Sequence, residues 1–190
     1  MVEQNKFSVP DWLERWQRNA PRRFGSDMES MAAAIELSAE SFRNGTGGPF
    51  GAVVVDDTNG SLVAAGSNCV TSLGLSIAHA EVVALSRAQS ILGNWDLSGA
   101  GRYSLFTSCE PCVMCYGAVI WSGVRRLVCA STKDDAEAVG FDEGPRPANW
   151  AEALRERGIA VETGLMRDEA NAALQEYGAT GGQIYNPGNQ

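Results

Sequence analysis

Apolar residues recur along the chain with two different periods, one typical of helices and one typical of strands. Helical spacing predicts a short helix between Pro10 and Pro21, and longer helices at residues 26–44, 78–92, 111–122, 149–157 and 167–177. Short apolar runs predict strands at residues 52–56, 61–66, 103–107, 126–131 and 159–163, the first two joined by a hairpin turn. Because strands alternate with helices, we expect an α/β domain in which a mixed five-stranded sheet lies between helical layers.

Two features of these predicted elements bear on packing and binding. Ser26 and Glu29 match a capping box at the start of helix 26–44, whose apolar stripe should face the core. That stripe consists of Met28, Met31, Ile35, Ala39 and Phe42. Asn68 directly follows the second strand, where its amide could either cap a loop or hold the edge of a ligand. The local sequence favours neither role over the other.

The two ends of the chain differ from its centre. Residues 1–25 are interpreted as an N-terminal extension, residues 26–178 as the main domain, and residues 179–190 as a tail that covers an active site. In the extension, Trp12, Leu13 and Trp16 lie at helical spacing. We expect this apolar face to dock on the body of the protein or on a second subunit.

Composition narrows the classes of partner. The 190 residues, 44% hydrophobic and 20% charged, are typical of one soluble globular domain. The net charge is −8, with no strong basic run, whereas proteins that grip a phosphate backbone normally carry a basic patch. We therefore expect a small-molecule partner and no nucleic acid. No apolar stretch approaches transmembrane length and the start lacks an apolar signal core, so no membrane association is expected.

The candidate chemistry lies in two short segments, His79-Ala80-Glu81 and Pro111-Cys112-Val113-Met114-Cys115. An H-x-E…P-C-x-x-C arrangement is typical of zinc deaminases. The predicted zinc ligands are His79, Cys112 and Cys115, which leave a fourth position open for water. Cysteines three residues apart share one face of a helix, and Pro111 at its first position would place the thiolates at the helix N-terminus.

Glu81 is predicted to be a proton shuttle that takes a proton from the bound water and delivers it to a ring nitrogen. A lone His is usually a surface or core residue, and C-x-x-C alone is as often redox-active or structural. Here the only His of the chain lies inside the motif, and the other three cysteines do not form a second ligand pair. The predicted reaction is hydrolytic deamination. Cysteines used as thiolate ligands also indicate a reducing compartment, and we expect the cytoplasm.

Several blocks resemble a known family. They are Pro49-Phe50-Gly51-Ala52, Ser67-Asn68, Ala78-His79-Ala80-Glu81, Thr107-Ser108-Cys109-Glu110-Pro111-Cys112 and Gly140-Phe141-Asp142-Glu143. With these, the chain resembles the cytidine-deaminase-like superfamily, and within it the bacterial guanine deaminases. The resemblance implies a three-layer α/β/α fold, one zinc ion per subunit, and a homodimer in which the C-terminal segment crosses to cover the partner's active site. It also places Asn68 at the purine edge, Phe50 and Phe141 against the ring, and Ala80 among the substrate-binding residues.

The resulting hypothesis is deamination of guanine to xanthine and ammonia in purine catabolism. Glu143 would be a second carboxylate that helps the amine to leave or holds a ring N–H, although an acidic loop residue is often only solvated. Ammeline, cytosine and cytidine are alternative substrates, because sequence does not display the few hydrogen bonds that separate such rings. A non-catalytic zinc module is a third alternative, against which the intact Glu81 argues.

Overall fold

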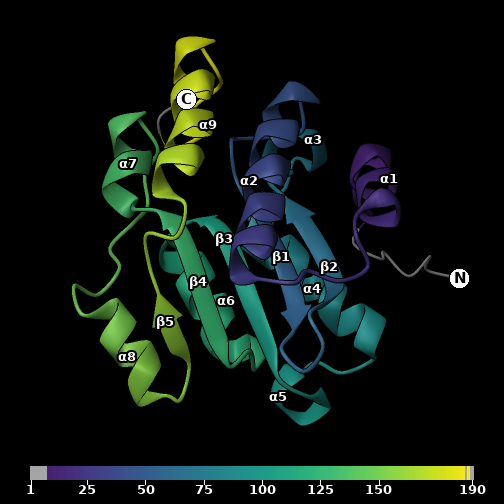
Figure 1. Ribbon diagram of the computed structural model, residues 1–190. Coiled ribbons are helices and arrows are strands. Elements are labelled where there is room, and N and C mark those ends of the chain that lie inside the picture. Colours follow the sequence, from purple (N-terminus) through teal and green to yellow (C-terminus); the bar gives the residue numbers. More distant parts are fainter. Residues whose placement is uncertain (1–7, 187, 189–190) are drawn as a thin grey trace, which may run out of the picture.

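A computed structural model describes residues 8–186 and 188, and its centre is a five-stranded mixed sheet (Figure 1). The strands are β1 (Gly51–Asp56), β2 (Ser61–Ser67), β3 (Tyr103–Cys109), β4 (Arg126–Ser131) and β5 (Ala160–Glu162). They lie in the order β2-β1-β3-β4-β5. β1 is antiparallel to β2 and β3, whereas β3, β4 and β5 run parallel to one another. The predicted mixed sheet of five strands is confirmed.

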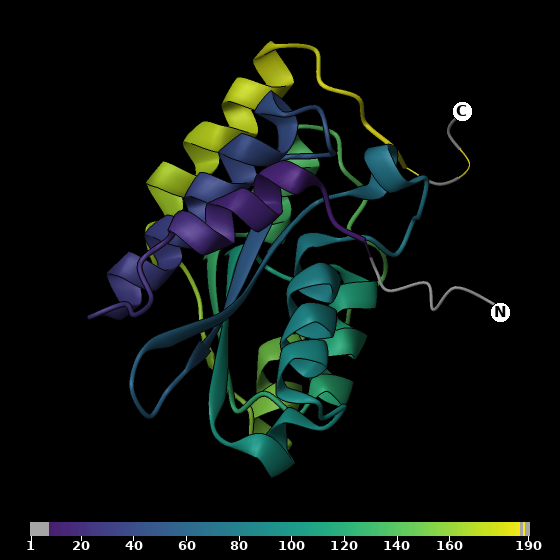
Figure 2. The ribbon, with the colours of Figure 1, turned by 90° about the vertical axis from the view of Figure 1, so that its right-hand side faces the viewer.

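Helices cover both faces of the sheet, which gives three layers (Figure 2). One face carries α1 (Asp11–Asn19), α2 (Asp27–Arg43) and α9 (Arg167–Ala179). The other carries α4 (Ala80–Leu92), α5 (Leu97–Ala100), α6 (Val113–Ser122) and α8 (Trp150–Glu156). Two short helices, α3 (Val70–Leu73) and α7 (Lys133–Ala138), complete the fold. Across residues 8–186 and 188, no helix is both long and apolar enough to span a bilayer.

The central strands are buried on both faces, so their side chains feed two separate cores. Val53 of β1 and Phe106 of β3 pack with α1, α2 and α9. Val54 and Leu105, one position away along each strand, pack with α4, α6 and α8. This alternation is the two-residue period of a strand, and burial on both faces explains the nearly continuous apolar runs in the sequence.

The N-terminal helix α1 docks on the body of its own chain. Leu13 is fully buried, and the side-chain amide of Gln17 pairs with edge strand β2, donating to the Val63 carbonyl (3.3 Å) and accepting from the Ala65 N–H (3.0 Å). Arg87 of α4 forms an ion pair with Glu14 of α1 at 2.7 Å. An amide that bonds to main-chain groups of an edge strand covers an edge that could otherwise pair with another chain.

Three local predictions were wrong. Met28 is 51% exposed because it lies in the outward-facing first turn of α2, and Leu37 occupies the core instead. Pro111 is not the first helical residue, since Cys112 is the N-cap of α6. Helices α3, α5 and α7 lie in segments for which the sequence predicted neither a helix nor a strand. Side chains begin two of them: Asp96 accepts from the Ser98 N–H at α5, and Thr132 forms a capping box at α7.

Candidate metal centre and active site

Two neighbouring helices on one face of the sheet bring the three predicted metal ligands together. His79 is the N-cap of α4, Cys112 is the N-cap of α6, and Cys115 lies in the first turn of α6. Their donor atoms all lie within 4.8 Å of one another. The Nδ1 atom of His79 is 3.5 Å from Cys112 Sγ and 3.6 Å from Cys115 Sγ. One imidazole nitrogen and two sulfurs that converge in this way leave a coordination position open toward the cavity beside them.

The protonation of these groups suits a divalent cation. A hydrogen bond from the Cys115 thiol, together with the contact with His79, lowers the pKa of Cys112 to about 4, although burial opposes this. Burial lowers the pKa of His79, but the hydrogen bond to Cys112 and the nearby charges of Cys112, Glu81 and Glu143 together raise it overall. Burial raises the pKa of the Cys115 thiol well above its usual value. A cation at this position would replace the proton on Cys115 and neutralise both sulfurs, so the donor set fits zinc.

A cavity of about 300 Å³ opens beside the three donors, within the range of small-ligand sites. Its wall includes the predicted residues Phe50, His79, Glu81, Cys112, Phe141 and Glu143. The rings of Phe50 and Phe141 meet edge to face with centroids 4.9 Å apart. The cavity therefore combines an aromatic wall with acidic groups and metal ligands, which suits a flat, polar ring.

Both acidic groups are buried, Glu81 with 6% and Glu143 with 7% of its surface exposed. Burial, together with the nearby Cys112 thiolate, raises the pKa of Glu81 to about 7 and that of Glu143 to about 8. A dication between the sulfurs acts in the opposite direction and favours both carboxylates. Two carboxyl groups that exchange protons near neutral pH are suited to general acid–base chemistry.

Comparison with known proteins agrees with this geometry. The model of the cytidine and deoxycytidylate deaminase zinc-binding region matches residues 25–131, more than half of the chain and all three candidate ligands. The chain belongs to this family. One zinc ion per chain is its cofactor, as the family match and the His/Cys/Cys cluster together indicate.

Three relatives of this family member are especially similar. Guanine deaminase from Bacillus subtilis is 43% identical over 110 residues, which cover 58% of this chain and 67% of the relative. The solved structure of guanine deaminase from Nitrosomonas europaea is 49% identical, covers 94% of this chain and 98% of that chain, and gives a TM-score of 0.88. A structure solved in complex with 2,6-diaminopurine is 51% identical, covers 94% and 95% of the two chains, and gives a TM-score of 0.87. The cytidine-deaminase-like fold is thereby confirmed.

Asn68 directly follows β2, is buried and is not among the cavity-lining residues. Within the protein it fills only one of its two predicted roles. Its Oδ1 accepts from the N–H groups of Gly48 (3.3 Å) and Val70 (3.2 Å), so the amide caps the loop. The Nδ2 group is buried and has no partner in the described part of the chain. A Cβ atom at Gly47 would collide with Asn68, which explains why glycine stands there. A buried donor without a partner is unusual and stays available to a ligand. Ala80, fully buried at the start of α4, is not among the cavity-lining residues.

The structure adds cavity residues that sequence reasoning did not identify. Tyr185 and Asn186, from the tail after α9, line the cavity of their own chain. The Tyr185 ring packs against Phe141 with centroids 5.5 Å apart. Asn186 accepts from the Asp142 N–H and donates to the Gly140 carbonyl, both at 2.9 Å. The signal in the sequence was an apolar and aromatic pair, Ile184-Tyr185, within an otherwise Gly- and Pro-rich tail.

Proposed function

We propose that this protein is a zinc-dependent guanine deaminase that hydrolyses guanine to xanthine and ammonia. The observation that carries the proposal is one cavity that holds a metal donor set, two buried carboxyl groups and an aromatic wall. Relatives that are 43% and 49% identical and described as guanine deaminases support guanine as the substrate. The negative net charge supports a small free base rather than a nucleic acid.

In the proposed mechanism, His79, Cys112 and Cys115 hold the metal. When bound, zinc lowers the pKa of a water molecule in its open position to about 7 and so supplies a nucleophile at neutral pH. Glu81 would accept a proton from the water that attacks C2 of guanine and would deliver that proton to N3. Glu143 donates a proton to the leaving amine, which departs as ammonia, and regains a proton from the C2 hydroxyl as C2=O forms; in its alternative role it holds a ring N–H. Both steps need carboxyl groups that gain and lose protons near pH 7.

The remaining predicted substrate-binding residues orient the ring. Phe50 and Phe141 pack against it, and the unpartnered Nδ2 of Asn68 donates to an acceptor on the purine edge. Ala80, between His79 and Glu81, binds the substrate through its backbone. A buried donor that only the correct ring satisfies discriminates strongly against rings that lack the matching acceptor.

The proposal also includes a cytoplasmic homodimer that exchanges C-terminal segments and acts in purine catabolism. In an exchange, a partner supplies the same segment to the same place, so the tail contacts within one chain are also those of an exchanged dimer. Trp121 of α6, 81% exposed, supports a contact surface outside the cavity. All five cysteines are free, which suits a reducing compartment. Light scattering should give twice the monomer mass. A monomeric mass at micromolar concentration would contradict both the homodimer and the exchange of C-terminal segments.

The deciding experiment is ammonia release from purified, zinc-loaded protein given guanine, ammeline, cytosine, cytidine, adenine and guanosine. Glu81→Gln is the blank, and Glu36→Gln, an exposed residue of α2, is the matched control with wild-type turnover expected. Fast ammonia release from guanine with formation of xanthine is the expected result. Turnover of a triazine or pyrimidine without turnover of guanine would overturn the substrate assignment. If the zinc-loaded protein deaminates none of these bases, the result would favour the alternative that it is a non-catalytic zinc module.

A further inference from the structure

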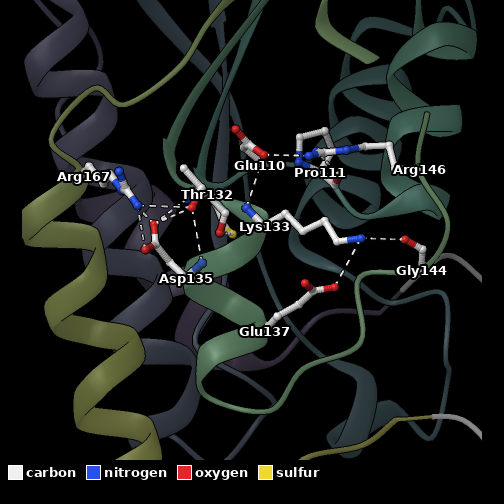
Figure 3. A network of polar contacts seen from close by, with 10 residues as sticks. Glu110, Pro111, Thr132, Lys133, Asp135, Glu137, Gly144, Arg146 and Arg167 are labelled. Carbon is white, nitrogen blue, oxygen red and sulfur yellow. Dashed lines mark hydrogen bonds and ion pairs between the residues drawn. The ribbon is translucent and has the colours of Figure 1, made fainter. Parts of the chain in front are cut away.

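The loop that carries Glu143 is anchored by a buried ion pair between Arg146 and Glu110, and Glu110 also lines the cavity (Figure 3). Arg146, three residues after Glu143, donates from Nη2 to Glu110 Oε2 at 2.7 Å. The side chains of Arg146 and Glu110 are only 6% and 12% exposed. Glu110 precedes the Pro111-Cys112 segment, so the pair joins the Glu143 loop directly to the segment that carries a metal ligand.

Arg146 makes further contacts that fix the direction of its side chain. Its Nη1 donates to the Pro111 carbonyl at 2.8 Å, and its guanidinium lies over the Trp150 ring with 4.1 Å to the centroid. A planar guanidinium can satisfy a carboxylate and a carbonyl in two directions while it stacks on an aromatic ring. A lysine ammonium is a point charge and cannot reproduce this arrangement.

The opposite side of the pair is held as firmly. Glu110 donates its backbone N–H to the Ser131 carbonyl at 2.8 Å, and its Oε2 also accepts from the Lys133 N–H at 3.2 Å. The Lys133 ammonium in turn donates to the Gly144 carbonyl at 3.1 Å. Glu110 therefore joins three segments: its backbone binds the end of β4, and its carboxylate binds both the start of α7 and Arg146 of the loop.

Glu143 itself receives little support from regular structure. One direct backbone bond holds it, from the Val113 N–H at the start of α6 to the Glu143 carbonyl at 3.0 Å. Lys133 binds the carbonyl of the next residue, Gly144, and the side chain of Arg146, three residues after Glu143, binds Glu110. Side-chain contacts therefore define the path of the chain here. A buried ion pair often adds little to the free energy of folding. We therefore expect the Arg146–Glu110 pair to fix the position of the loop rather than to stabilise the fold.

We infer that Arg146 is a positioning residue, which holds Glu143 at the cavity by locking its loop to Glu110 and Pro111. The inference rests on the proposed catalytic role of Glu143 and deepens it. Without the lock, the loop keeps its place in the fold, but the Glu143 carboxyl is no longer held at a fixed distance from the reacting ring.

The test crosses Arg146→Gln with Glu143→Gln in the zinc-loaded enzyme, using the most active base of the substrate panel. Because a misplacement of about 1 Å can cost on the order of 100-fold, we expect Arg146→Gln alone to lower kcat/KM by about 30-fold. In the Glu143→Gln background the same change should cost less than about threefold, since residues that act as one unit are not additive. Arg146→Lys should restore little, and Arg155→Gln, a half-exposed side chain of α8, should match wild type.

Two measurements separate positioning from a general loss of structure and from failure of the proposed function. Zinc content should stay at one per chain in Arg146→Gln, and hydrogen exchange should accelerate in residues 140–147 but not in α4 or α6. A full 30-fold loss that persists in the Glu143→Gln background, or loss of zinc, would overturn the inference. If the wild-type enzyme deaminates no base, the proposed function is wrong. If hydrogen exchange in residues 140–147 is unchanged in Arg146→Gln, only the positioning role of Arg146 is wrong.

Discussion

The two halves of the cavity are built in different ways. The metal half consists of His79, Glu81, Cys112 and Cys115, all at the first turns of α4 and α6, which pack together on one face of the sheet. The other half consists of residues without regular secondary structure, from the 140–147 loop and the tail: Phe141, Asp142, Glu143, Gly144, Tyr185 and Asn186. Backbone bonds of helices fix the first half, whereas side-chain contacts fix the second.

This difference predicts how each half responds to change. A ligand on a helix terminus keeps its place as long as the helix exists, so only its own substitution matters. A group on a loop depends on every side chain that anchors the loop, and its response is graded. Substitutions in the metal half should therefore act in an all-or-none way, and those in the loop half should act by degrees.

The largest effect should come from Cys115→Ser in the metal half. The hydroxyl does not replace a thiolate ligand, so zinc should be lost and activity should fall by at least about 10³-fold, because the metal generates the nucleophile. Zinc content by atomic emission and ammonia release measure the two effects. Cys69→Ser is the matched control, because Cys69 is a buried thiol that donates to the Ser67 carbonyl and is not a member of the ligand cluster. Full zinc and activity in Cys115→Ser would remove this cysteine from the metal centre.

Glu143→Gln, in the loop half, should have the next largest effect. The amide keeps the shape but cannot donate the proton to the leaving amine, so kcat should fall by about 100-fold, within the range of general acid catalysis. Zinc should stay bound, which separates this variant from Cys115→Ser. Steady-state kinetics and zinc analysis are the measurements. If kcat and KM both stay at wild-type values, Glu143 is only part of the loop structure.

The same division decides what the sequence alone predicts. The strands follow from apolar periodicity. The ligands His79, Cys112 and Cys115 follow from two short motifs of known chemistry, although His79 lies 33 positions before Cys112. Helix α7 was missed because it is short and polar, and it depends on a capping box rather than on an apolar stripe.

Long-range contacts could not be predicted for a different reason. Arg146 and Glu110 are 36 positions apart, and Asn186 lies 46 positions from Gly140. No periodicity links such pairs, so only the fold brings them together. Met28 was misassigned because the helical period alone does not show where the buried stripe begins.

A smaller effect is expected at the contact between the tail and the loop. Asn186→Ala removes two hydrogen bonds, to the Asp142 N–H and the Gly140 carbonyl. A net hydrogen bond contributes about 1 kcal/mol, and both of these are exposed, so we expect KM to rise about fivefold with kcat nearly unchanged. Asn44→Ala, an exposed helix-end amide away from the cavity, is the control. A lowered kcat with unchanged KM would mean that the tail serves the chemical step rather than binding.

The smallest effect should come from Arg167→Gln, which leaves the cavity intact. Arg167 of α9 binds Asp135 of α7 at 2.8 Å, and this hydrogen bond holds the pKa of Asp135 well below its usual range. A depressed carboxyl pKa stabilises the fold above the unfolded pKa of about 4, and this stabilisation is lost as the pH falls below that value. Because Arg167 is exposed, we expect the variant to lower Tm by about 2 °C or less at pH 7. The difference should shrink between about pH 5 and pH 3, where Asp135 of the unfolded chain becomes protonated. Turnover should stay at the wild-type level, because this ion pair joins α7 to α9 and does not touch the Glu143 loop; a loss comparable to that of Arg146→Gln would show that the whole network, and not the Arg146 joint, sets the geometry of the site.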